Sequence, residues 1–250
     1  MEKVPIPLRV LRESLQVEID APAQRMRLDE ILPALNILQD AFAEAAIRRH
    51  GLPVTCARGC SACCRIQAVP VTPVEAYALL LLVEGMPEPR QSEVRARFAE
   101  RVARLYEAGL ADGFLEGKRP ATREQAKAEM RQYLDLGLAC PFLENDACSI
   151  YPSRPLTCRE YLVTSAKELC SDPLSRPVKV VPAIVQGIEA NRLTAEGFLG
   201  RAVFAIPLTL ALVYAQAHRA ELERTYSGQE LLSRSVGDLF GLAARQGLLS

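Results

Sequence analysis

The hydrophobic positions of the first part of the chain follow the period of a helix. Between residues 28 and 50 they recur every three or four residues, at Leu28, Ile31, Leu32, Leu35, Leu38, Phe42, Ala45 and Ala46. Residues at this spacing share one face of an α-helix, so an amphipathic helix is predicted here. Asp29 is placed to begin it, Pro33 falls near its first turn, and Gly51 is placed to end it.

Two further helices begin with the same local signal. Thr72 and Glu75, and again Thr122 and Gln125, have the spacing of a capping box, in which each side chain bonds the backbone amide of the other residue. Pro73 suits the first helical position, where no donor is missed. The first helix should run to about residue 85 and, being apolar nearly all round, should be buried. The second should run towards residue 136, and residues 92–108 form a charged amphipathic helix between them.

The rest of the chain also indicates helices. They are predicted near residues 194–201, 207–224 and 229–245, and a further one should start at Pro155 and carry Cys158. Residues 178–181 are the best candidate strand. We therefore expect a mainly α fold, a single irregular helical domain with cysteine-rich metal-binding loops. It would span residues 1–250, with the cysteine-cluster region at about 52–172 and a C-terminal helical region at about 178–250.

Charge and hydropathy argue against two classes of partner. Thirty basic residues balance thirty acidic ones, so no positive excess attracts nucleic acid. The longest apolar stretch, around residues 203–217, contains Pro207 and is too short for an untilted bilayer span. Residues 1–20 carry charges throughout, unlike a signal peptide. We expect a cytoplasmic protein that binds neither nucleic acid nor membrane.

The cysteines are the chemically unusual feature of the composition. Seven of the eight fall into two groups: Cys56-x3-Cys60-x2-Cys63-Cys64, and Cys140-Pro-Phe-Leu-x4-Cys148-Ser-Ile-Tyr-x2-Arg-Pro-x2-Cys158-Arg. In a reducing compartment, clustered cysteines indicate metal binding or redox chemistry rather than disulfides. The predicted metal ligands are Cys56, Cys60, Cys63, Cys64, Cys140, Cys148 and Cys158. Cys170 stands alone, and it is as compatible with a small buried hydrophobic residue as with a part in the metal site.

Basic residues flank both groups. A metal held by four thiolates carries a surplus negative charge, and nearby cations lower thiol pKa values and stabilise the thiolate. Arg58, Arg65, Arg154 and Arg159 are therefore predicted to contact the cofactor. Which four cysteines hold a given metal stays open, but both groups are expected to contribute to a shared site. Glu144 and Asp146 are interpreted as solvated turn residues.

The two cysteine groups resemble the YkgJ-type cysteine-cluster family, a zinc- or iron-chelating domain. The resemblance rests on both spacings and on the helix start at Thr72, Glu75 and Ala76, and it covers about residues 56–161. It implies an iron–sulfur cluster or iron as the cofactor, with zinc as the alternative. A flagellin lysine methylase is similar in its cysteine pattern, which implies that protein-modifying chemistry is compatible with such a site.

Three functions follow from the cysteines. The first is an iron–sulfur or other iron-dependent protein, an oxidoreductase or a protein- or peptide-modifying enzyme, because seven thiols exceed the four that one cubane or one zinc ion requires. The second is a zinc-stabilised binding module without catalysis. The third is a radical S-adenosylmethionine enzyme, since Cys56, Cys60 and Cys63 have its motif spacing, although that superfamily requires repeated strand–helix units. The partner would be an unspecified protein, peptide or redox carrier.

Overall fold

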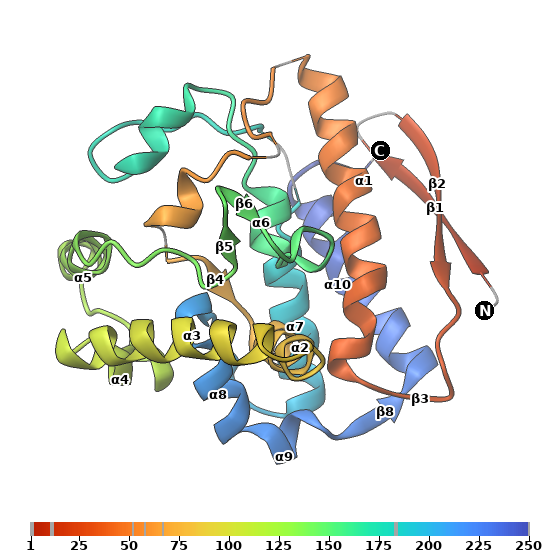
Figure 1. Ribbon diagram of the computed structural model, residues 1–250. Helices are drawn as coiled ribbons and strands as arrows, with labels where there is room; N and C mark the ends of the chain where they lie inside the picture. Colours follow the sequence, from red (N-terminus) through yellow and green to blue (C-terminus); the bar gives the residue numbers. More distant parts are fainter. Residues whose placement is uncertain are drawn as a thin grey trace.

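The computed structural model describes residues 3–10, 13–51, 53–57, 59–66, 68–182 and 185–249 (Figure 1). Helices predominate, as predicted, and the described strands form only two-stranded antiparallel pairs. None of the described helices combines the length and the apolar character that a bilayer crossing requires. The division into a cysteine-cluster region and a C-terminal region of one domain stays a prediction.

A hairpin that was not predicted begins the chain. Strands β1 (Lys3–Val10) and β2 (Glu13–Asp20) pair from Lys3 opposite Asp20 to Val10 opposite Glu13. Alternate side chains turn inward, which buries Leu8, Val10 and Ile19. Figure 1 shows the hairpin lying along one side of α1 (Leu32–His50).

The first core lies between α1, α7 (Gly187–Leu199) and α10 (Gly228–Arg245). Strand β3 (Arg25–Arg27) pairs with β8 (Thr225–Ser227), which ties the start of the chain to the C-terminal helices. The helix predicted from residue 28 starts as a 3-10 turn, η1 (Leu28–Ile31), and becomes α-helical only at Leu32. Pro33 explains the delay, because its ring would clash with the carbonyl four residues earlier in a regular α-helix.

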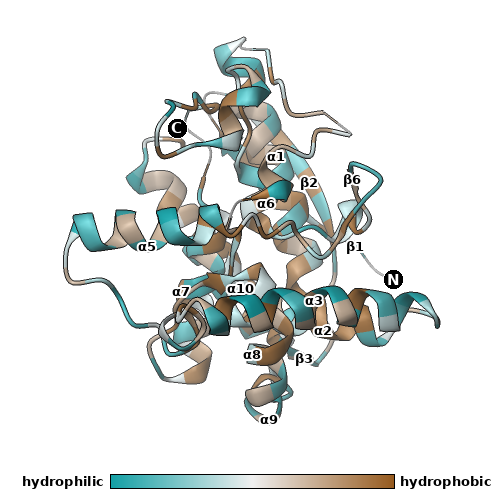
Figure 2. Ribbon diagram, turned by 60° about the vertical axis from the view of Figure 1, so that its left-hand side comes forward, coloured by the Kyte–Doolittle hydropathy of each residue, from teal (hydrophilic) through white to brown (hydrophobic). Residues whose placement is uncertain are grey.

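The second core surrounds α2 (Pro73–Glu84), which is buried as predicted. It packs against α8 (Ala211–Ala217), with α3 (Arg90–Glu107), η5 (Leu208–Leu210) and α9 (Arg219–Leu222) around the pair. Strands β4 (Pro70–Val71) and β7 (Ile206–Pro207) hold the two segments together. Figure 2 shows the hydrophobic colour of α2 beside the hydrophilic outer side of α3.

A smaller cluster joins α4 (Ala111–Leu115) to α5 (Arg123–Asp135). Its centre is Tyr133, which is fully buried and shares a 3.1 Å hydrogen bond with the hydroxyl of Thr209. Both predicted capping boxes are confirmed: Thr72 with Glu75 begins α2, and Thr122 with Gln125 begins α5.

Two expectations about the C-terminal region were wrong. Residues 178–181 do not form a regular strand: Val180 makes a single bridge to Val163, and prolines at 177 and 182 withhold the donors that a longer ladder needs. Residues 207–224 are not one helix but are divided into η5, α8 and α9, with the break between the two α-helices at His218.

Candidate metal centre

The first cysteine group lies on a loop and one 3-10 turn rather than on a regular helix. The amide of Cys60 donates to the carbonyl of Ala57 over 2.9 Å, and η2 (Cys63–Arg65) follows. Between Ala57 and Cys60, Gly59 has φ +87°, a left-handed conformation that residues with a Cβ rarely adopt. The loop is tied to the segment after Cys158, because the amide of Thr55 donates to Val163 and the amide of Val163 donates to the sulfur of Cys56 (3.2 Å).

The second group begins with a tight hairpin. Strands β5 (Leu143–Glu144) and β6 (Ala147–Cys148) are joined by Asn145 and Asp146, whose φ angles of 47° and 59° are those of a two-residue hairpin turn. The hairpin is closed further by the amide of Ser149, which donates to the carbonyl of Phe142 over 2.9 Å. It returns the chain towards Cys140 and so holds Cys148 near it.

Cys158 is carried by the short helix α6 (Leu156–Glu160), which follows the 3-10 turn η3 (Tyr151–Ser153). The start of α6 has no cap of its own, but the amide of Leu156 donates to the carboxylate of Glu75 over 2.8 Å. The other carboxylate oxygen of Glu75 accepts from the amide of Thr72 over 2.9 Å. One buried carboxylate thus caps α2 and α6 together, a link that the sequence signal for α2 alone did not reveal.

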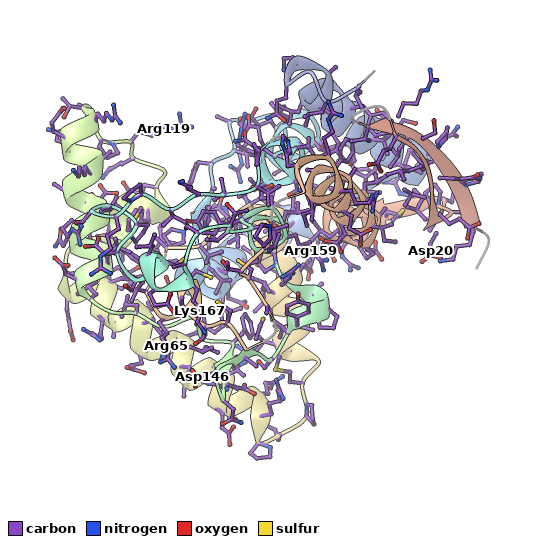
Figure 3. The ribbon with its side chains drawn as sticks, turned by 90° about the horizontal axis from the view of Figure 1, so that it is seen from above. Asp20, Arg65, Arg119, Asp146, Arg159 and Lys167 are labelled. Carbon is purple, nitrogen blue, oxygen red and sulfur yellow. The ribbon has the colours of Figure 1, made fainter. Side chains whose placement is uncertain are left out.

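The structure places the two cysteine groups side by side. The amide of Cys140 donates to the carbonyl of Cys64 over 2.6 Å. The hydroxyl of Ser61 donates to Asp146 over 3.1 Å, and Arg65 forms an ion pair with the same carboxylate. Figure 3 shows Arg65 and Asp146 next to each other on their two loops. Chain segments about 80 residues apart therefore meet at this point.

None of the eight cysteines forms a disulfide. Cys63 lies near several of them. Burial is the main cause that raises the pKa values of Cys140, Cys148, Cys158 and Cys170, and in all four a charge on Cys63 raises the pKa further. Such coupling requires the thiols to be near one another. The sulfur atoms of both groups therefore share one neighbourhood.

Protonation differs across this neighbourhood. Burial raises the pKa of Cys140 to about 12 and keeps its thiol neutral at physiological pH. A hydrogen bond between the side chains of Cys63 and Cys64 lowers the pKa of Cys63 to about 7 and raises that of Cys64. The pair thus holds one thiolate beside one thiol, and Cys63 is the cysteine best prepared to bind a cation first.

Sequence reasoning left the role of Cys170 open. Cys170 is buried on η4 (Lys167–Ser171), which packs against η2, and charges on Cys63, Cys56 and Cys60 raise its pKa further after burial has raised it. The eighth thiol therefore belongs to the same neighbourhood. The sequence did not indicate this position, because Cys170 lies outside both cysteine groups along the chain.

The four predicted cofactor-contacting arginines have different environments. Arg58 lies outside the described residues. Arg65 is mostly exposed and pairs with Asp146. Arg159 is buried and donates to the carboxylate of Asp40 (2.6 Å) and to the carbonyls of Arg154 and Pro152, so its visible role is to fix the loop before α6. Contact of these residues with a cofactor stays a prediction.

Arg154 has the environment that best suits an anionic centre. Its positive charge lowers the pKa values of Cys56, Cys63 and Cys148, although burial or hydrogen bonding is the larger influence on each. Its Nε is buried and has no hydrogen-bond partner. Arg101, which was not predicted, has a similar smaller effect on Cys140.

The donor set suits zinc or iron, but the ligands are not pre-arranged. Within the described part of the chain, no group of three or more His, Cys, Asp or Glu side chains is positioned to hold a metal ion. Glu144 instead pairs with Arg97 over 2.8 Å, and His218 stacks on Tyr214. Thiolates are the preferred ligands of zinc and of iron–sulfur clusters, so the sulfur atoms would have to turn towards a bound metal.

One family model matches the chain. Residues 55–175 match CxxCxxCC, described as "Putative zinc- or iron-chelating domain". The matched segment begins just before Cys56 and ends after Cys170, so it includes all eight cysteines. No curated protein and no solved structure matches the chain.

Proposed function

We propose, from the match of residues 55–175 to the CxxCxxCC model of a zinc- or iron-chelating domain, that the chain holds an iron centre. The centre is an iron–sulfur cluster or iron bound by thiolates of Cys56, Cys60, Cys63, Cys64, Cys140, Cys148 and Cys158. It serves an oxidoreductase or a protein- or peptide-modifying reaction. The partner is a protein, a peptide or a redox carrier.

One observation carries this proposal: free thiols from separate loops gather around Cys63 without forming disulfides. The backbone bond from Cys140 to Cys64 fixes the two loops to each other. A metal bound here would replace the thiol protons, and Cys63, whose pKa the hydrogen bond with Cys64 lowers, lies near the other thiols.

Iron is preferred to zinc for two reasons. The number of neighbouring thiols exceeds the four that a closed zinc site uses, which suits a cluster or a second metal. The positive charge of Arg154 lowers the pKa values of Cys56, Cys63 and Cys148, and positive charge near sulfur tunes the potential of an iron–sulfur cluster.

The radical S-adenosylmethionine alternative gains no support from the fold. That superfamily requires repeated strand–helix units. The described strands are short antiparallel pairs, and helix follows helix between Thr72 and Asp135.

Metal analysis of anaerobically purified protein tests the proposal. Iron should be present with visible absorption that dithionite bleaches, and Cys60→Ser and Cys148→Ser should each lower the iron content. Ala62→Ser, which alters the same loop without removing a thiol, is the control and should retain iron. Colourless protein with stoichiometric zinc would reject the iron centre. If neither cysteine variant changed the bound metal, the shared site itself would be wrong.

A further inference from the structure

A pocket of about 700 Å³ lies beside the loop that precedes Cys158. Its walls come from the first half of α1, from α2, and from residues 152–155. Its volume falls within the range of 300–1,000 Å³ typical of small-molecule sites. None of the cysteines lines the pocket, so it is separate from the thiol neighbourhood.

The two helices give the pocket an apolar wall. Leu32 and Ile37 contribute from α1, and Ala78, Leu79 and Leu82 contribute from α2. Ile37 is 38 % exposed, which is unusual for a large aliphatic side chain in this molecule. Aliphatic side chains on both walls favour a ligand with an apolar body, because its burial removes hydrocarbon surface from water.

Four of the five charged side chains that line the pocket already have partners. Asp29 accepts from Arg27 over 2.9 Å, and Asp40 accepts from Arg159 over 2.6 Å. The carboxylate of Glu75 is held by backbone amides, and burial raises its pKa. The three acids of the pocket are therefore engaged by groups of the protein itself.

Arg154 is the fifth charged side chain of the pocket. Its guanidinium lies 4.3 Å above the ring of Tyr151, and no carboxylate pairs with it among the described residues. Its buried Nε has no hydrogen-bond partner in the structure, and a buried donor without a partner costs about 1–3 kcal/mol. A carboxylate would accept from it and would balance its charge.

We propose that this pocket binds a small organic anion, a carboxylate with an apolar body, whose carboxylate pairs with Arg154 and whose body lies between α1 and α2. The proposal rests on the residues of the pocket and holds whichever metal the thiols bind.

Calorimetric titration of the anaerobically purified full chain with octanoate tests it. Octanoate should bind, whereas octylamine, which has the same chain and the opposite charge, should not. Arg154→Met should weaken octanoate binding about tenfold to a hundredfold, the usual size of a lost hydrogen bond to a charged group. Arg119→Met removes an exposed cation that lies well apart from Arg159 in Figure 3, and it should leave octanoate affinity unchanged.

A second pair of variants addresses the apolar wall. Ala78→Leu fills part of the pocket and should reduce octanoate affinity without changing any charge, while Ala126→Leu on the exposed face of α5 should not. Metal content and circular dichroism of each variant separate loss of the pocket from loss of the metal or of the fold. Absence of octanoate binding, equal binding of octylamine, or full affinity in folded Arg154→Met or in Ala78→Leu would overturn the proposal.

Discussion

Replacing Glu75 tests whether one buried carboxylate connects the core to the cysteine loops. Its side chain is almost wholly buried and accepts from the amides of Thr72 and Leu156, which begin α2 and α6. Glu75→Ala removes both acceptors at once. Because neither amide has another partner in its helix at that position, both become buried donors without acceptors.

The expected loss follows from these two bonds. A buried donor left unpaired costs about 1–3 kcal/mol, so two cost about 2–6 kcal/mol. Part of this is offset, because burial of the carboxylate is itself unfavourable, as the raised pKa of Glu75 shows. We expect Glu75→Ala to lower the free energy of unfolding by about 3 kcal/mol.

The chain contains its own control for this substitution. Gln125 makes the same capping interaction with Thr122 at the start of α5, but there both residues are exposed. Water can replace Gln125, so Gln125→Ala should cost about 1 kcal/mol or less. Urea unfolding of the two variants and of the parent chain, followed by circular dichroism, gives both values.

Glu75→Ala should have a further effect that Gln125→Ala lacks. Without its acceptor, the first turn of α6 loosens, and Cys158 lies on that helix. Metal content should therefore fall in Glu75→Ala and stay unchanged in Gln125→Ala. Equal costs for the two variants would refute the argument that burial makes the Glu75 bonds valuable, and unchanged metal in Glu75→Ala would refute the link to Cys158.

Two further predictions concern other parts of the fold. Burial raises the pKa of Tyr133 to about 12 from an ordinary value near 10. The neutral phenol therefore stabilises the fold fully below pH 10, and this stabilisation is lost as the pH rises to 12. The free energy of unfolding should fall by about 3 kcal/mol over this range. Urea titrations at pH 8 and pH 11.5 give the free energy of unfolding at each pH, and Tyr133→Phe should make the difference between these two free energies smaller. A difference equal to that of the parent chain would contradict the prediction. Gly117→Ala should destabilise the chain by about 2–4 kcal/mol, because the residue has φ +64° and its new Cβ would lie 2.4 Å from the ring of Phe204. Gly137→Ala, with φ +60° and open space around it, should cost only about 1–2 kcal/mol, and equal thermal shifts for the two would show that the ring contact is unimportant.

Local signals in the sequence predicted local structure well. The capping boxes at Thr72 and Thr122 depend on residues three positions apart, so no distant contact can change them. The hairpin at residues 3–20 was missed although its apolar positions alternate. Strand β1 contains Pro5 and Pro7, and in a two-stranded sheet their missing donors can face away from the partner strand.

The candidate site was predicted in composition but not in geometry. The spacing of Cys56 to Cys64 and of Cys140 to Cys158 indicated a shared site, and the structure places the loops together. The contacts that bring them together could not be derived from the spacing, because they depend on the fold. They include the bond from Leu156 to Glu75, the hairpin turn at Asn145, and the approach of Cys170.

The absence of a pre-arranged ligand set among the described residues has a physical explanation. Where burial keeps thiols such as Cys140 protonated, the sulfur atoms carry no charge, and weakly polar neutral thiols have little reason to point at a common centre. A bound metal would change this, since it would displace thiol protons and attract the thiolates that ligate it. Structural metal binding supplies about 10–16 kcal/mol, which is enough to turn side chains and to fix loops that few backbone bonds hold. The loops around Cys63 therefore bring the sulfur atoms near one another, and on the proposed function a bound metal would complete their arrangement.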